Sequence, residues 1–346
     1  MMKKFLSLLM AVLLAASLAA CGGDSGSAGS GSDNDSGSSA AGGASQAEAV
    51  DTNTVAVGAV VIARDDVSED DVYNFVSAIF ENTDAITQQH DKGKELSLDF
   101  AASVTSVPYH PGAARYFSEK GIDVAAVKEG AGSGESKALT FVTGGETGTY
   151  YAFGGVLASY VSNNGGPSVT AVVGNGSQAN VEDLTAGGAQ LGFVQSDVMS
   201  YAYNGERLFD TAVTGFSVAA ALYMEQVQIA TTNPDIKSVA DLEGKIVSIG
   251  ASGSGVFFNA IDVLGAYGLT EEDISPVFQS FGDSADNLKD GKIDAAFIVA
   301  GAPTPAISDL ALSKPTYLVG LDEEHVNALL ESSPFYSAYT IPAGTY

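Results

Sequence analysis

The chain has 346 residues, of which 45% are hydrophobic, and this is enough to build two compact lobes. Its 42 acidic residues outnumber 15 lysines and arginines and give a formal net charge of −27, which disfavours nucleic acid and anionic lipid headgroups as partners. The single cysteine excludes an internal disulfide and a cysteine cluster around a metal.

The first residues are typical of an export signal. Lys3 and Lys4 precede the uncharged apolar run Phe5–Ala20, which is short for a membrane span and suits the hydrophobic region of a signal peptide. Small residues then lead into Cys21, as in a bacterial lipobox. We predict a lipoprotein signal peptide over residues 1–20 and lipidation of Cys21. The protein would then be extracytoplasmic and anchored to the bacterial cell membrane; a plain secretory signal with an incidental cysteine is the alternative.

Two segments have the composition of linkers. Residues 21–50 consist mostly of Gly, Ser, Ala, Asp and Asn, which cannot bury enough surface to order a chain, so we expect a flexible tether. A second Gly/Ser-rich linker occupies residues 129–137 and interrupts the folded part.

Strands and helices alternate along the remaining sequence. Before the second linker we expect a strand over Thr54–Ala63 and a helix over Glu69–Asn82. After the second linker we expect five pairs, each a strand followed by a helix. They are Ala138–Val142 with Tyr150–Val161, Val169–Val173 with Asn180–Ala186, Leu191–Val194 with Val198–Tyr203, Lys245–Ile249 with Val256–Tyr267, and Ala295–Val299 with Pro305–Leu312. This alternation predicts an α/β fold with mostly parallel sheets, in which ligands bind at the carboxyl ends of the strands.

A weak internal repeat supports two similar lobes. The segment Val181–Val194 and the segment Ala285–Ile298 carry Leu, Gly and Phe at the same spacing. A strand with a glycine-rich loop precedes each copy, at Phe141–Thr149 and at Ile246–Gly255. Because βα units share composition, chance similarity is the competing explanation; otherwise the repeat indicates two related lobes around a cleft.

Four polar loops follow predicted strands. Glycines allow a ligand to approach the backbone, and helix starts offer free N–H groups, so such loops can hold an anion without a charged side chain. Each loop alone is better explained by ordinary turn and helix-cap chemistry than by a ligand site. Together they predict a ligand site at Thr143, Gly144, Gly145, Gly148, Thr149, Tyr150, Ser177, Asn180, Gln195, Ser252 and Ser254.

Signatures of enzymes are missing from the sequence. His90, His110 and His325 have no metal-ligand spacing, and there is neither a nucleophile elbow nor a phosphate-binding P-loop. His110 is expected to be a structural loop residue. We therefore predict a protein that is not an enzyme and that uses no cofactor and no metal.

The motifs resemble one family over nearly the whole folded part. The run Leu139–Gly155, the loop Gly176–Asn180, the block Asp241–Lys245 and the closing block Ile341–Tyr346 are similar to TAXI-family solute-binding subunits of tripartite ATP-independent periplasmic (TRAP) transporters. The resemblance implies a two-lobed periplasmic-binding-protein type II fold, a glutamate-like amino acid or other small carboxylate as ligand, and a TRAP-type membrane permease as partner. The loop residues named above match the family's site region.

The order of the segments departs from the family pattern. In the family, the closing block precedes the strand, the helix and a His-Pro-Gly-Ala segment that here stand first, with His110–Ala113 as that last segment. The chain thus resembles a circularly permuted member, with the second linker joining the old ends. We expect residues 51–127 plus 138–224 to form the first lobe and residues 225–346 the second.

These observations predict a solute-binding lipoprotein that delivers its ligand to a transporter. A sensory lipoprotein of the same fold, reporting its ligand to a signalling receptor, is an alternative. A two-lobed transferase or lyase is another, but such an enzyme would need a Lys, Arg, His or Cys in the loops of the cleft, and none stands there.

Overall fold

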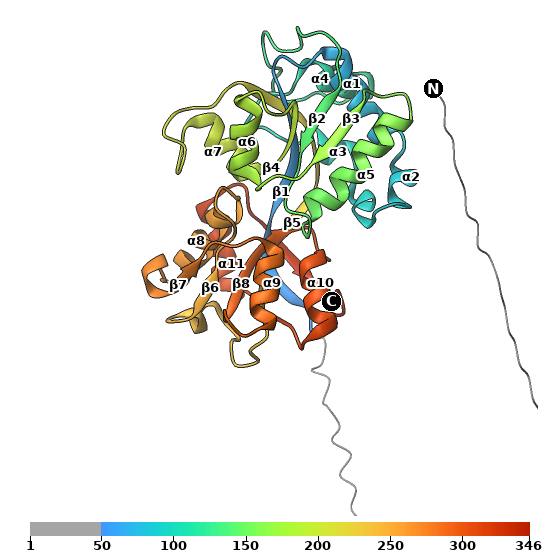
Figure 1. Ribbon diagram of the computed structural model, residues 1–346. Coiled ribbons are helices and arrows are strands. Elements are labelled where there is room, and N and C mark those ends of the chain that lie inside the picture. Colours follow the sequence, from blue (N-terminus) through green and yellow to red (C-terminus); the bar gives the residue numbers. More distant parts are fainter. Residues whose placement is uncertain (1–49) are drawn as a thin grey trace, which may run out of the picture. The chain divides into compact units, whose positions relative to one another are not determined.

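The computed structural model describes residues 50–346, and Figure 1 shows their arrangement. The predicted signal peptide, the lipidation site Cys21 and nearly all of the first tether lie outside the described residues. No helix in the described part is both long and apolar enough to cross a membrane.

Two long antiparallel strands run through both halves of the folded part. Strand β1 (Thr52–Arg64) pairs with β5 (Phe216–Thr231) from Ala56 to Arg64, and both are almost entirely buried. Such burial explains why their sequences are continuous hydrophobic runs instead of alternating ones. The whole sheet has the order β3-β2-β4-β1-β5-β8-β6-β7, so β1 and β5 join the strands of one lobe to those of the other.

The first lobe surrounds the second half of β1 and the first half of β5. Parallel strands β2 (Leu139–Val142), β3 (Val169–Val172) and β4 (Leu191–Gln195) complete its sheet, with β4 antiparallel to β1. Its helices are α1 (Glu69–Phe80), α2 (Thr83–Thr87), η1 (Asp91–Glu95), α3 (Leu98–Ala101), α4 (Pro111–Glu119), α5 (Thr149–Asn163), α6 (Ser177–Thr185) and α7 (Ser196–Asn204).

The second lobe surrounds the other halves of the two long strands. Its remaining strands are β6 (Ile246–Ser248), β7 (Ser275–Val277), β8 (Ala295–Ala300), β9 (Tyr317–Leu318) and β10 (Ser337–Ile341). Its helices are η2 (Val239–Leu242), α8 (Val256–Ala266), η3 (Glu271–Asp273), α9 (Phe281–Lys289), α10 (Pro305–Ser313) and α11 (Glu323–Ser332).

The two lobes repeat one topology. The order β3-β2-β4-β1 in the first lobe corresponds to β7-β6-β8-β5 in the second, and in each lobe the first three strands of this order are parallel. The two copies of the sequence repeat occupy equivalent places, as α6 with β4 and as α9 with β8. This is the predicted α/β periplasmic-binding-protein type II fold, with two lobes that are each a mostly parallel sheet flanked by helices.

Buried hydrophobic side chains of β1 belong to two separate cores. The first core contains Ala59–Ala63 together with side chains from α1, α5, β4 and the first half of β5. Val55 and Val57, at the start of β1, pack instead with Val227 and α8 in the second core. Strand β1 thus contributes side chains to both cores, and the position 224–225 lies inside β5, a strand that was not predicted from the sequence.

The chain ends and the second linker occupy defined places. Strand β10 pairs with β1 so that Thr52 lies opposite Ile341, and the Asp51 carboxylate accepts a hydrogen bond from the Ala343 N–H at 2.8 Å. The two ends of the folded part are thus neighbours. The second linker is exposed for most of its length, but Gly132 exchanges backbone hydrogen bonds with Asp65 and Glu69, so this linker lies against the start of α1.

Candidate functional site

A cavity of about 90 Å³ lies between the two lobes. At roughly 10–15 Å³ for each water-sized position, this space suits a ligand of several heavy atoms. Residues from the first lobe and from β5 that line it are Gly144, Gly145, Gly148, Thr149, Tyr150, Gly174, Asn175, Gly176, Ser177, Gln195 and Glu225. Residues from the second lobe that line it are Ala251, Ser254, Gly255, Val256, Ser280, Phe281, Val299 and Ala300.

Four helices begin at this cavity. The first residues of α5 and α6 line it from the first lobe, and those of α8 and α9 line it from the second. The first turn of a helix carries unpaired N–H groups and the positive end of the helix dipole. Because four such ends meet around one space, an anionic group would be stabilised there without a cationic side chain.

Glycines allow the two lobes to approach each other at the cavity. Gly176 has a φ of +102°, and a Cβ there would lie 3.1 Å from the Cα of Ser254 in the other lobe. A Cβ on Gly255 would lie 1.4 Å from Oε1 of Gln195, so only glycine fits against this first-lobe side chain. The close approach thus depends on the absence of side chains at these loops.

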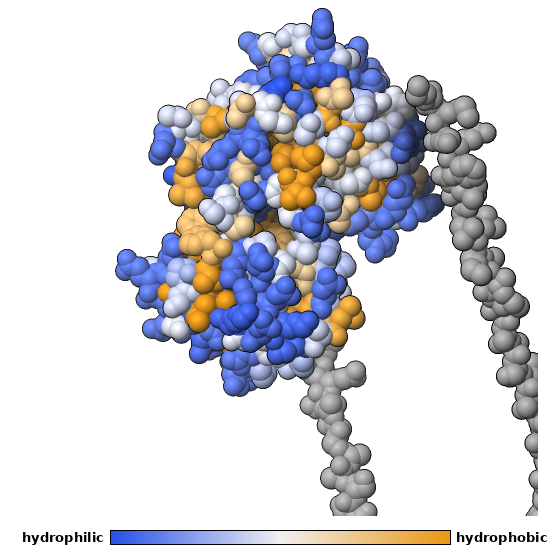
Figure 2. Space-filling model, in the orientation of Figure 1, coloured by the Kyte–Doolittle hydropathy of each residue, from blue (hydrophilic) through white to orange (hydrophobic). Residues whose placement is uncertain are grey.

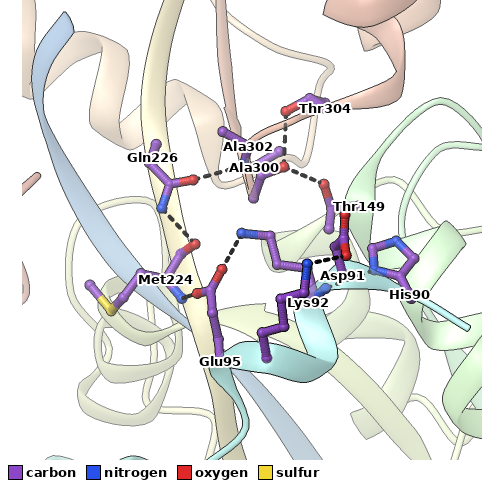
Figure 3. A network of polar contacts seen from close by, with 12 residues as sticks. His90, Asp91, Lys92, Glu95, Thr149, Met224, Gln226, Ala300, Ala302 and Thr304 are labelled. Carbon is purple, nitrogen blue, oxygen red and sulfur yellow. Dashed lines mark hydrogen bonds and ion pairs between the residues drawn. The ribbon is translucent and has the colours of Figure 1, made fainter. Parts of the chain in front are cut away.

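Hydrogen bonds connect the lobes around the cavity. The Ala179 N–H donates to the Gly253 carbonyl at 2.9 Å, and the Thr149 hydroxyl donates to the Gly301 carbonyl at 2.8 Å. Figure 3 shows the second of these contacts beside a network in which Gln226 of β5 accepts a hydrogen bond from the Ala302 N–H. The surface is indented where the lobes meet (Figure 2). The hydrogen bonds above show that the two lobes are in contact beside the cavity.

Polar side chains at the cavity are partly preorganised. Ser177 Oγ accepts a hydrogen bond from the Gln195 N–H at 3.0 Å, and Gln195 Nε2 donates to Asn259 Oδ1 at 2.6 Å. The Ser254 hydroxyl is buried and has no hydrogen-bond partner among the described residues. A buried hydroxyl without a partner carries a desolvation cost, which a ligand can remove by supplying that partner.

One carboxyl group lines the cavity. Glu225 projects from β5 and is 2% exposed, and the Tyr150 hydroxyl donates to its Oε2 at 2.6 Å. Desolvation raises the pKa of Glu225 to about 8, although the Tyr150 hydrogen bond opposes this shift. The carboxyl is therefore mostly protonated near neutral pH. No Lys, Arg or His is among the lining residues in the described part of the chain.

Eight of the eleven predicted site residues line the cavity: Gly144, Gly145, Gly148, Thr149, Tyr150, Ser177, Gln195 and Ser254. Thr143 and Asn180 lie behind it, where Asn180 Nδ2 donates to the carbonyls of Thr143 and Phe193 at 2.6 and 2.8 Å and fixes the ends of two strands. The structure places Ser252 outside the cavity, in an adjoining surface hollow with Gln178 that shares Ala251 and Ser254 with the cavity.

The sequence analysis missed Glu225 and the apolar lining residues of the second lobe. Glu225 stands inside the apolar run of β5, and a buried acid in such a run is uncommon unless it has a partner. The presence of an acid within this apolar run was the signal by which Glu225 could have been identified as a site residue. Val256, Phe281 and Val299 carry no comparable signal, because the same residue types fill the core of each lobe.

Comparison with known proteins places the chain in a family. The profile of the NMT1-like family matches residues 39–121 and 141–346. The chain belongs to the NMT1-like family. The matched ranges leave out residues 122–140, which contain the second linker.

The solved structures that the chain matches include two binding proteins and one ligand binding core. The NMT1-like chain is similar to the alkanesulfonate-binding protein SsuA from Xanthomonas axonopodis pv. citri bound to MOPS, at 21% identity over 55% of this chain and 62% of that one, with a TM-score of 0.38. The chain is 20% identical to the periplasmic aliphatic sulphonate binding protein SsuA from Escherichia coli, over 54% of this chain and 60% of that one, with a TM-score of 0.34. It is 14% identical to the GluR0 ligand binding core in complex with L-glutamate, over 57% of this chain and 95% of that one, with a TM-score of 0.34. The chain spans about three fifths of the two sulfonate-binding proteins.

His110 of this NMT1-like chain stabilises the local structure and does not line the cavity. His110 is buried and caps α4, since its Nδ1 accepts a hydrogen bond from the Gly112 N–H at 3.2 Å while its Nε2 lies 3.1 Å from the Val67 carbonyl. Burial lowers the pKa of His110 to about 4, so the ring is neutral. No group of three His, Cys, Asp or Glu side chains in the described part could hold a metal ion.

Proposed function

We propose that this protein is an extracytoplasmic solute-binding protein that holds a small carboxylate between its lobes and delivers it to a membrane transporter. The observation that carries the proposal is the meeting of four helix N-termini around one interlobe cavity, with the unpartnered Ser254 hydroxyl beside them. Helix N-termini and neutral donors suit a carboxylate. The eight predicted residues that line the cavity are its proposed contacts, and the site needs neither a cofactor nor a metal.

Binding without chemistry fits this cavity better than catalysis. A transferase or lyase would need a nucleophile, a base or an electrophile beside the substrate. The one titratable acid at the cavity, Glu225, is held by Tyr150 and lies beside no second acid–base group such as His or Lys among the lining residues. We therefore propose that the protein is not an enzyme.

The ligand claim is tested on the purified protein. Mass spectrometry of the denatured protein identifies small molecules that co-purify, and calorimetry then measures binding of L-glutamate, glutarate, L-valine, 3-methylbutanoate and D-glucose. The proposal predicts binding of at least one carboxylate at one site per chain and none of glucose. Binding of sugars alone, or of no small acid at all, would contradict it.

The partner is proposed to be a TRAP-type permease, because the loop motifs and closing block resemble TAXI subunits. A sensory receptor and an ABC-type permease are the alternatives. Ligand uptake by vesicles that contain the co-purified permease separates them: TRAP-type transport proceeds without ATP, whereas a strict need for ATP indicates an ABC-type partner. A membrane partner that takes up no ligand indicates a sensor.

Membrane attachment is proposed to occur through lipid on Cys21, and no nucleic acid is expected as a partner. A Cys21→Ala variant should appear in soluble export fractions or accumulate as the unprocessed precursor. A variant that fractionates with the membrane and migrates like the wild type would overturn the lipid anchor and leave ligand binding unaffected.

A further inference from the structure

The surface hollow that adjoins the ligand cavity is built by both lobes. Its volume is about 470 Å³. The first lobe contributes Glu182 of α6 and Leu208, which follows α7, and the second lobe contributes Phe257 of α8, Glu271 of η3 and Phe278, which follows β7. The two halves of the hollow are joined by the hydrogen bond from the Ala179 N–H to the Gly253 carbonyl.

Large apolar side chains are exposed at this hollow. Leu208 is 52% exposed and Phe278 is 51% exposed. The ring of Phe278 lies against that of Phe257, with the two ring centroids 6.2 Å apart. Large apolar groups gathered at one hollow of a protein surface mark an interaction site, and aromatic side chains are frequent anchors of protein–protein interfaces. The hollow therefore has the character of a docking surface.

The lining of the hollow is also acidic. Neither Glu182 nor Glu271 forms an ion pair with a described residue, and Glu182 accepts only a neutral hydrogen bond, from Gln178 Nε2 at 3.1 Å. Arg207, the neighbour of Leu208, binds both carboxylate oxygens of Asp262, at 3.1 and 2.7 Å, so its charge is already compensated. The two acids of the hollow thus lack a counter-charge, which a cationic partner would supply.

The charge of the hollow disfavours other occupants. Anionic lipid headgroups would be repelled by these acids and by the formal net charge of −27. A second copy docked about a two-fold axis would bring the same acids to the same surface, and like charges facing each other across an interface cost several kcal/mol. The tether at residues 21–50 contains no Lys, Arg or aromatic residue that would match the hollow.

We propose that this hollow is the surface on which the membrane partner docks, and that the docking segment of the partner carries an apolar side chain between lysines or arginines. The inference rests on the proposed function for the statement that the partner is a membrane protein. The apolar side chain would pack against Leu208 and Phe278, and the cations would pair with Glu182 and Glu271. Because the hollow is built by both lobes, a segment bound in it would contact both at once.

Photo-crosslinking in whole cells tests the surface. The photoreactive amino acid p-benzoyl-L-phenylalanine replaces Phe278 in the full chain, and in a matched chain it replaces Leu312, which is 88% exposed on α10. Mass spectrometry then identifies the crosslinked peptide. We expect position 278 to crosslink to an integral membrane protein, in a segment outside its membrane spans that carries Lys or Arg beside an apolar residue. Position 312 should give no such product.

Charge reversal tests whether the acids of the hollow contribute to docking. Glu182→Lys combined with Glu271→Lys should lower the crosslinking yield at position 278 by about tenfold or more, because like charges then face each other across the interface. The matched control is Asp123→Lys combined with Glu243→Lys, which changes the net charge equally. It replaces one exposed acid in each lobe, and neither acid lines the hollow. The control should keep the wild-type yield, and circular dichroism should show that both double variants are folded.

The outcomes separate the docking surface from solute binding. Crosslinks from position 278 only to lipid, to a second copy of the chain or to no macromolecule would overturn the inference, as would a yield that reversal of the two acids leaves unchanged. Calorimetry with the small acids named above is run on the same variants, because neither Glu182 nor Glu271 lines the cavity. If an acid binds and the expected crosslink does not form, the inference fails and solute binding stands. If no acid binds and the crosslink forms as expected, solute binding fails and the docking surface stands.

Discussion

Ser254 is the single hydroxyl on which the ligand claim can be tested most simply. It is buried at the cavity without a partner in the described part of the chain, whereas Ser252, two residues away, is exposed in the adjoining hollow and does not line the cavity. Ser254→Ala should weaken binding of the preferred acid by about 0.5–1.5 kcal/mol if its partner is neutral and by up to about 3 kcal/mol if the partner is charged.

Ser252→Ala is the matched control for this prediction. It should leave the calorimetric affinity unchanged. Equal losses for both variants would mean that the loop contributes by its conformation and not by the Ser254 hydroxyl.

The sequence predicted the loops of the site better than the individual contacts. Gly-, Ser- and Thr-rich segments after strands indicate where a chain can approach a ligand, and all four such loops do reach the cavity region. Which hydroxyl faces inward depends on the path of each loop, so Ser252 and Ser254 could not be distinguished. Asn180 was predicted as a contact because an amide is equally suited to ligands and to strand carbonyls, and here it binds the carbonyls.

Helix η1 of the first lobe is bound to β5, near the point where this strand crosses between the lobes, through the side chain of Glu95. Glu95 lies between Lys92 and the chain at Met224, with Oε1 2.5 Å from Lys92 Nζ and Oε2 accepting the Met224 N–H at 3.1 Å (Figure 3). The side chain of Lys92 is 5% exposed, so its ammonium depends on this partner. Breaking a buried ion pair leaves an uncompensated charge.

Glu95→Ala should therefore lower the free energy of unfolding. We expect about 1–3 kcal/mol, at the lower end of the effects of broken buried pairs because Glu95 is partly exposed. Asp91→Ala, which removes the exposed pair with Lys94 in the same helix, should leave the urea midpoint unchanged. Equal urea midpoints for the two variants would show that the contact of Glu95 with Lys92 and Met224 does not stabilise the fold.

Among the elements, helix α1 was predicted together with its start, whereas the long crossing strand β5 was not predicted. Ser68 accepts a hydrogen bond from the Asp71 N–H and starts α1 close to the predicted position. β5 is a long, mostly apolar run over Phe216–Thr231, and a buried helix has the same appearance in sequence. Its identity comes from pairing with β1 and β8, which are distant in the chain.

At the scale of the whole molecule, we propose that the chain is a circularly permuted member of its family. Supporting this, Thr52 pairs with Ile341, Asp51 binds Ala343, and the first core combines Ala59–Ala63 with β2 and β4. A variant that joins Tyr346 to Asp51 through a short Gly/Ser linker and opens the chain at Gly130 should fold and bind the same ligand, because neighbouring ends can be exchanged.

Opening the joined chain between Met224 and Glu225 is the control, because this cuts β5 where it crosses between the lobes. That variant should not fold. Cooperative unfolding by both variants, or by neither, measured by circular dichroism, would contradict the proposed equivalence of the ends.

The central claim, that a small acid binds between the two lobes, is tested most directly at Gly255. A side chain there would project from the second lobe into Gln195 and Ser177 of the first, whereas Gly265 near the end of the same helix has no atom near its Cβ position. The measurement is calorimetric titration of the preferred acid into the wild type, Gly255→Leu and Gly265→Leu. We expect unchanged binding by Gly265→Leu and a loss of about tenfold or more by Gly255→Leu, with both variants folded. Binding by Gly255→Leu as tight as by the wild type would place the ligand elsewhere and contradict the account.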